Sequence, residues 1–272
     1  MTCRAAVLIA LTASLLCACA TNPSPGSVPA LLDRVLPTQA LLIGEQHDAM
    51  EHQALQRDVV LALAARGRLG GVVMEMAEQG RGTAGLPNDA SEEMVREALN
   101  WTPDGGWPWA AYGPVVMAAV RSGAPVVGGN LPRSRMREAM GEAALDGLIG
   151  AEAVRQQREA IRDGHCGLLP ESQIAPMARI QLARDRAMAQ TLESAVQRAG
   201  PGKTVVLVAG NGHVRRDLGV PLYLPSDLKH QVLMAQAGEA KFSGQPADAV
   251  WRTPALPPRD HCVELRQRMP AR

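Results

Sequence analysis

The sequence predicts an α/β fold, in which a mostly parallel sheet is sandwiched by helices and carries additional C-terminal edge strands. Short aliphatic runs alternate with longer amphipathic stretches, as expected when buried parallel strands are joined by covering helices. Aromatic residues make up only 3% of the 272 residues, so the core is aliphatic. Apolar residues make up 46%, which excludes a disordered chain, and charged residues make up 20%, too many for a multi-spanning membrane protein.

The first segment of the chain is predicted to be a lipoprotein signal peptide, residues 1–18. Arg4 precedes a short apolar run that is too short to span a bilayer as a helix. The following Leu16-Cys17-Ala18-Cys19 resembles a bacterial lipoprotein signal, and the small residue before Cys19 favours that cysteine for lipidation over Cys17. An ordinary secretory peptide is the alternative. By resemblance to known lipoprotein sorting patterns, Ala20 rather than Asp after the cysteine favours the outer membrane, facing the periplasm or the cell surface.

Residues 19–30 are rich in Pro, Ser and Gly and are predicted to form a flexible tether to a single domain spanning residues 31–272. After cleavage three cysteines remain. If Cys19 carries lipid, Cys166 and Cys262 are left in an oxidising compartment. They either form a disulfide or stay as unpaired small apolar residues.

The domain contains four apolar runs that are predicted to be strands and five helical patterns between them. The strands are residues 40–43, 71–76, 124–127 and 203–209, and the helices are 51–65, 91–99, 112–121, 133–140 and about 172–198. Strand–helix–strand repetition predicts parallel pairing. Residues 230–237 and 249–253, around a Gly-Gln-Pro turn, are predicted to add edge strands.

Charge excludes one class of partner. Lys and Arg number 28 against 27 Asp and Glu, a formal charge of +1, so no overall field attracts nucleic acid or an anionic bilayer. We expect no nucleic-acid partner, and function must rest on specific local sites.

Polar side chains follow all four central strands, at the edge where ligands bind in an open parallel sheet. We expect Glu45, His47, Glu75 and His213 to share one pocket, able to bind a divalent metal or transfer protons. Each also has an ordinary explanation, since a histidine after a strand can be a hydrogen-bonded loop residue and Glu75 can pair with a nearby Arg or His.

Four of the seven aromatic rings gather in one short stretch: Trp101, Trp107, Trp109 and Tyr112. Flat rings at this density suit stacking on a planar ligand, and a hydrophobic plug or lid over the cleft explains them equally well.

Several sequence blocks together resemble one family. They are Gly44-Glu45-Gln46-His47-Asp48 with His52; Trp107-Pro108 and Tyr112-Gly113-Pro114; Asn130-Leu131-Pro132-Arg133; His165-Cys166-Gly167 with Leu169-Pro170; Arg184-Asp185-Arg186-Ala187-Met188-Ala189; and Gly210-Asn211-Gly212-His213-Val214-Arg215 with Gly219-Val220-Pro221. These blocks occur in this order along the chain, and together they resemble the ChaN-like haem-binding lipoproteins. The resemblance implies a lipid-anchored α/β protein that binds haem, forms a homodimer with haem at the interface and is linked to iron acquisition. It also implies kinship with erythromycin esterases and Tiki-type metalloproteases.

Haem needs an iron ligand and cations for its propionates. Tyr112 is the preferred phenolate ligand, with His165 and His213 in reserve, and Arg215 is expected to pair with a propionate. The alternatives are a packed Tyr112 ring with its hydroxyl satisfied and a solvated Arg215. No metal beyond haem iron is expected under this hypothesis.

Two rival hypotheses remain open. In a metal-dependent hydrolase, Glu45, His47, Glu75 and His213 would hold a divalent ion that activates water, although the chain lacks a His-Glu-x-x-His motif. In the other, the protein is a structural or partner-binding lipoprotein whose pocket has lost its function.

Overall fold

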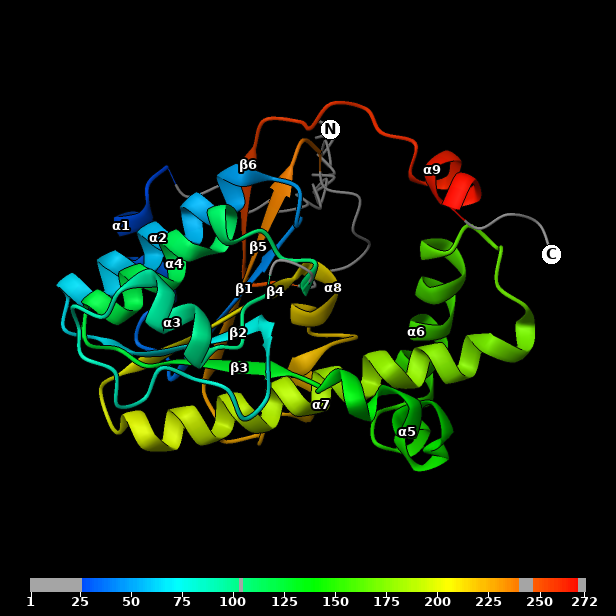
Figure 1. Cartoon of the computed structure of the whole chain (residues 1–272), viewed down its shortest axis with the longest axis horizontal. Helices are drawn as coiled ribbons and strands as arrows, with labels where there is room; N and C mark the ends of the chain where they lie inside the picture. Colours follow the sequence, from blue (N-terminus) through cyan, green and yellow to red (C-terminus); the bar gives the residue numbers. More distant parts are fainter. Residues whose placement is uncertain (1–25, 103–104, 240–246, 269–272) are drawn as a thin grey trace, which may run out of the picture.

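The computed structural model describes residues 26–102, 105–239 and 247–268 (Figure 1). Its sheet has six strands in the order β3-β2-β4-β1-β5-β6, and every neighbouring pair is parallel. The predicted α/β fold with a parallel sheet between helices is confirmed. The proposed signal peptide, Cys19 and the Gly-Gln-Pro turn lie outside the described residues.

All six predicted strands form. They are β1 (Ala40–Glu45), β2 (Leu69–Glu78), β3 (Val126–Asn130), β4 (Thr204–Gly210), β5 (His230–Ala237) and β6 (Ala249–Thr253). Only one of the two C-terminal strands is at an edge. β5 pairs with both β1 and β6, so β6 is the edge strand and β5 is interior, which corrects the expectation that both lie at the edge.

Helices cover both faces of the sheet. The α-helices are α1 (Val28–Val35), α2 (Met50–Ala65), α3 (Glu92–Ala98), α4 (Trp109–Arg121), α5 (Met136–Gly141), α6 (Ala151–Gly164), α7 (Glu171–Ala199), α8 (Asn211–Val214) and α9 (His261–Arg268). Short 3-10 helices span Arg133–Arg135, Ala143–Gly147 and Val220–Tyr223. Figure 1 shows α1 to α4 on one side of the sheet and α7 on the other.

Side-chain alternation along the strands builds two separate apolar cores. On β4, Val206 and Val208 face the layer of α1, α2 and α4, whereas Val205 and Leu207 face α7. Successive residues of a strand point to opposite faces, so a run that is apolar throughout supplies both cores.

Helix α7 is 29 residues long and extends beyond the sheet, where α5 and α6 pack against it (Figure 1). Its buried positions recur at helical spacing and include Ala178, Leu182, Asp185, Ala189 and Leu192. Asp185 is therefore a carboxylate on an otherwise apolar stripe. This position matters for the candidate site.

Both ends of the domain are attached to its body. Helix α1 begins at Val28, inside the range 19–30 predicted as tether, because Leu31, Leu32 and Val35 pack into the core. At the other end, Cys166 and Cys262 form a disulfide with 5.7 Å between Cα atoms, which attaches α9 beside the end of α6. Among the described residues, no helix has the length and apolar character needed to cross a membrane.

Candidate functional site

The candidate site lies where the carboxyl ends of β1, β2 and β4 meet. The connection from β1 to β2 runs through α2 on one face of the sheet, whereas the connection from β4 to β5 runs on the opposite face. The loops after these two neighbouring strands therefore diverge at the carboxyl end of the sheet. This is where ligands bind in open α/β sheets. A side chain at Gly44 would collide with Asn211 and Val214 of α8, so glycine here allows α8 to pack tightly on β1.

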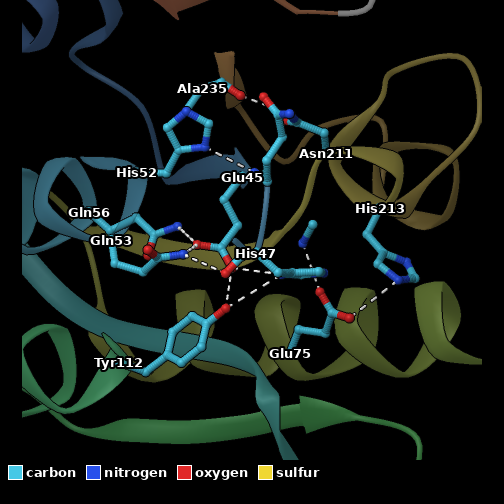
Figure 2. A network of polar contacts seen from close by, with 12 residues as sticks. Glu45, His47, His52, Gln53, Gln56, Glu75, Tyr112, Asn211, His213 and Ala235 are labelled. Carbon is cyan, nitrogen blue, oxygen red and sulfur yellow. Dashed lines mark hydrogen bonds and ion pairs between the residues drawn. The ribbon is translucent and has the colours of Figure 1, made fainter. Parts of the chain in front are cut away.

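Glu45 is the centre of a buried hydrogen-bond network (Figure 2). Its Oε1 accepts from the Tyr112 hydroxyl at 2.6 Å and contacts His47 Nδ1 at 2.7 Å. Its Oε2 accepts from the side-chain amides of Gln53 and Gln56, at 2.8 and 2.7 Å. Four partners use the four acceptor positions of a carboxylate. Glu45 therefore serves as an anchor that orients its neighbours.

His47 is the exposed imidazole of the site. When the imidazole is neutral and its Nδ1 donates to Glu45, its Nε2 carries the free lone pair, and no described residue hydrogen-bonds to Nε2. The side chain is 41% exposed. Burial lowers the pKa of His47, but the hydrogen bond to Glu45 and the charge of Glu75 outweigh it, so that its pKa is raised.

A second carboxylate–imidazole pair lies on the α7 side. His213 Nδ1 is 2.6 Å from Asp185, which is fully buried, and its Nε2 is 3.5 Å from Glu75 Oε1. Burial alone would lower the pKa of His213, but the two carboxylates raise it to about 9. Burial raises the pKa of Asp185 to about 6, although His213 opposes this. At neutral pH the pair is an imidazolium next to a carboxylate.

Glu75 lies between the two imidazoles. Its Oε2 accepts a hydrogen bond from the Gly210 amide at 2.7 Å. The backbone amide at the end of β4 is therefore bound to a carboxylate of the same chain. The register of β2 against β3 shifts between Met74 and Glu78, and such irregularities redirect side chains. The four residues predicted to share a pocket, Glu45, His47, Glu75 and His213, are thus brought together.

The tryptophan cluster covers the β1 side of this network. The Trp107 ring meets His47 edge-on, with centroids 4.8 Å apart, and is perpendicular to the Tyr112 ring. Trp101 packs against Trp109 and Tyr112 behind it. Beside the cluster is a cavity of about 280 Å³, lined among others by Glu75, Trp101, Trp107, Asn130, Arg133 and Arg184.

Three of the residues predicted to bind haem have other partners in the structure. Tyr112 is only 1% exposed, and burial beside the Glu45 charge raises the pKa of its phenol, which opposes the phenolate form. Arg215 pairs with Asp217 at 2.6 Å. His165 ends α6, where its Nδ1 contacts the Ile161 carbonyl. No hydrogen bond or ion pair within the described parts of the chain joins His165 or Arg215 to the network.

Sequence reasoning assigned no site role to Gln53, Gln56 and Asp185 of the network or to Arg184 of the adjoining cavity, although Arg184 and Asp185 stand in one of the family blocks. A signal existed for three of them. Gln53 and Gln56 occupy buried positions of α2, at the helical spacing of Val59, Val60 and Leu63, and Asp185 does the same on α7. A polar residue at a periodic core position indicates a buried polar partner. Arg184 gives no such signal, because its surroundings come from distant segments.

The donor geometry also bears on metal binding. Across the described ranges, no three His, Cys, Asp or Glu side chains form a group that could hold a metal ion. The four-residue metal site thus stays a prediction. What the arrangement offers directly is proton transfer, with two imidazoles each oriented by a buried carboxylate.

The family described as haem-binding uptake, Tiki superfamily, ChaN matches residues 31–224. This chain belongs to that family. The match covers the network, the tryptophan cluster and the cavity, and supports haem as the cofactor of this chain. No curated protein matches the chain at a significant level.

Comparison with solved structures finds one that shares the fold and others with lower similarity. ChaN of Campylobacter jejuni, described with cofacial haem binding, has a TM-score of 0.66 and 24% identity, covering 82% of this chain and 90% of that one. The type III effector HopBA1 has a TM-score of 0.45 and 12% identity, covering 86% and 95%. The erythromycin esterase EreC, in its open conformation, has a TM-score of 0.40 and 13% identity, covering 76% and 72%.

Proposed function

We propose that this protein is an exported, lipid-anchored haem-binding protein linked to haem and iron acquisition. Membership of a haem-binding family over residues 31–224 carries the proposal. The residues fit the cofactor, because the structure offers an imidazole with a free Nε2, indole rings beside it, and a cavity with an unpaired guanidinium. Haem, when bound, supplies an iron that such a nitrogen can ligate.

His47 is the side chain we propose as the iron ligand, in place of Tyr112. Glu45 fixes the tautomer of His47 and holds its ring in place, as carboxylates do for metal-binding histidines. The Tyr112 phenol would have to lose both its proton and its bond to Glu45. His213 is less accessible, with 13% of its side chain exposed and both ring nitrogens facing carboxylates.

Titration of the soluble domain, residues 20–272, with haemin tests the proposal. We expect a saturable shift of the haem absorption band. His47→Ala should change the band and weaken binding about tenfold or more, whereas Tyr112→Phe should leave the band unchanged. No shift with wild-type protein at micromolar haemin would overturn haem binding. A changed band in Tyr112→Phe alone would return the ligand role to Tyr112.

Lipid anchoring is proposed on the signal pattern and is consistent with the Cys166–Cys262 disulfide, since disulfides persist outside the cytosol. Metabolic labelling of the full chain with radioactive palmitate tests it. Cys19→Ala should abolish the label and release the protein from the outer-membrane fraction, while the matched control Cys17→Ala should keep both. Loss of label in Cys17→Ala instead would show that Cys17 is the modified residue.

A homodimer with haem at its interface is part of the proposal. The Campylobacter jejuni ChaN structure is described by cofacial haem binding, and a pair of subunits would supply two haem sites that face each other. Light scattering should show the mass doubling as haemin is added. An unchanged mass at saturating haemin would rule out an interfacial site.

Hydrolysis is a second candidate, favoured by the two carboxylate-oriented imidazoles on either side of Glu75. Chromogenic esters assayed with wild type, His47→Ala and His213→Ala test it, with metal analysis of the purified protein alongside. Turnover lost in both variants supports hydrolysis, and a stoichiometric ion lost in both supports its metal-dependent form. Equal rates in all three proteins would overturn it.

A further inference from the structure

Two arginines line the cavity, and neither guanidinium has an acidic partner among the described residues; that of Arg133 donates to the Gly105 carbonyl at 2.7 Å. Arg184 stands out because its guanidinium has no oxygen partner among the described residues. The group is charged at any physiological pH. Its Nε is buried without a hydrogen-bond partner, and its Nη2 contacts only the Met136 sulfur, at 4.0 Å. No carboxylate of the described residues lies within ion-pair distance of it. By contrast, Arg179 pairs with Asp146 and Arg215 with Asp217.

The charge of Arg184 is only partly compensated by its surroundings. Burial lowers the pKa of Arg184, the nearby charges of Glu75 and Asp185 oppose this, and Arg133 adds to the lowering. A half-buried cation without a hydrogen-bonded partner is costly to keep. An anion bound in the cavity would remove that cost.

A second polar atom in the cavity is also unsatisfied. The Asn130 amide donates to the Glu75 carbonyl at 2.8 Å, but its Oδ1 is buried without a partner. Arg184 and Asn130 both line the cavity, together with the Trp101 and Trp107 rings. The cavity thus combines an unused cationic donor, an unused acceptor and two indole rings.

We propose that this cavity is a carboxylate-binding site, in which Arg184 binds the carboxylate of a ligand whose flat conjugated body lies beside Trp101 and Trp107. A volume of about 280 Å³ is at the low end for ligand pockets, so it admits one small aromatic acid or the edge of a larger flat molecule. Two sources fit this chemistry, a haem propionate and a free aromatic acid. The haem source rests on the proposed function, and the free-acid source does not.

Matched pairs of charged and neutral probes test the site. Haemin is compared with its dimethyl ester by absorption, and 4-nitrobenzoate with 4-nitrobenzamide by quenching of tryptophan fluorescence. With wild type, we expect the acid of at least one pair to bind about tenfold more tightly than its neutral analogue, the factor typical of a charge-assisted hydrogen bond. In Arg184→Met the ratio should fall to about one.

Two further variants sharpen the test. Arg184→Lys keeps the charge and should keep part of the preference for the acid. Arg186→Met is the matched control, since Arg186 is exposed two residues along α7 and its carboxylate neighbour is Glu142, at 3.8 Å. It should keep the full wild-type ratio.

The arms distinguish the two sources. If Arg184→Met abolishes the preference for haemin over its dimethyl ester, the ligand carboxylate is a haem propionate. If it abolishes the preference for 4-nitrobenzoate over 4-nitrobenzamide, the ligand is a free aromatic acid. If wild type does not bind haemin at all, the proposed function fails while the nitrobenzoate pair still decides this site. Equal binding of acid and neutral probe by wild type in both pairs, or an unchanged ratio in Arg184→Met, would overturn the site.

Discussion

The two halves of the site differ in the kind of charged group at their centre, a carboxylate with every acceptor position used in one and a guanidinium without an acidic partner in the other. On the α2 side, Glu45 has four hydrogen-bond partners, and three of them are buried side chains. The buried atoms left without a partner on this side are the amide oxygens of Gln53 and Gln56, whereas on the α7 side they include a cationic donor, Arg184 Nε, beside Asn130 Oδ1. We call the α2 half closed because the Glu45 charge is fully hydrogen-bonded, which holds its donors in position, whereas a buried cationic donor without a partner indicates a missing anion. The α2 half thus fixes the geometry, and the α7 half is arranged to receive a ligand.

The largest effect is expected from breaking the closed half at its centre. Glu45→Ala leaves the buried donors of Gln53, Gln56 and Tyr112 without an acceptor, so the free energy of unfolding should fall by about 3 kcal/mol or more. Urea denaturation measures it. Glu51→Ala, an exposed carboxylate in the first turn of α2, is the control and should lose less than about 1 kcal/mol. Similar losses would contradict the anchoring role of Glu45.

A smaller effect is expected from titrating His213. Its pKa is raised from 6.5 to about 9 in the fold, so its stabilisation is fully present below pH 6.5 and is lost as the pH rises through 9. The free energy of unfolding should therefore fall by about 1–3 kcal/mol between pH 6.5 and pH 9.5.

Urea midpoints at the two pH values provide the measurement. His213→Gln should remove most of the difference, while His261→Gln, at the exposed start of α9, should keep it. A pH dependence that survives in His213→Gln would show that another group titrates.

Removing one of the hydrogen-bond donors to Glu45 perturbs the closed half less than removing Glu45. Tyr112→Phe loses a hydrogen bond to a carboxylate, and three partners remain, so we expect a loss of about 1–2 kcal/mol. Tyr223→Phe is the matched control. Its hydroxyl is buried without a partner, so removing it should be neutral or stabilising. Equal thermal melting shifts for the two variants would mean that the Glu45 bond contributes nothing.

The smallest effect is expected on the open half. Arg184→Met removes a guanidinium without an acidic partner, so stability should change by less than about 1 kcal/mol in the absence of ligand. Arg179→Met is the comparison, because Arg179 is bound to Asp146 by three hydrogen bonds and should lose about 1–2 kcal/mol. A larger loss from Arg184→Met than from Arg179→Met would show that Arg184 is structural.

Much of the fold followed from local pattern. Continuous apolar runs predicted the strands, and the C-terminal pair was placed at 230–237 and 249–253, where β5 and β6 are found. Their order in the sheet did not follow, because pairing partners are distant in sequence. Helix α6 was also missed, since its apolar positions are few and its packing surface is α7 rather than the sheet.

The part of the site formed by polar residues at the ends of strands was predictable from the sequence. Glu45, His47, Glu75 and His213 follow or end apolar runs, and parallel strands bring such positions to one edge. The hydrogen-bond partner of Tyr112 was not predictable, because its sequence context shows a phenol near tryptophans but not the distant Glu45 carboxylate that accepts its hydrogen bond.

The sequence by itself determined the class of fold, the edge of the sheet that carries the polar residues, and the family resemblance. These depend on periodicity and on short blocks of adjacent residues. Only the tertiary structure decided which carboxylate orients which imidazole, that Cys166 is bonded to Cys262, and that Arg184 has no acidic partner. Those facts depend on contacts between segments far apart in the chain, where a hydrogen bond is made or lost over less than 1 Å of displacement.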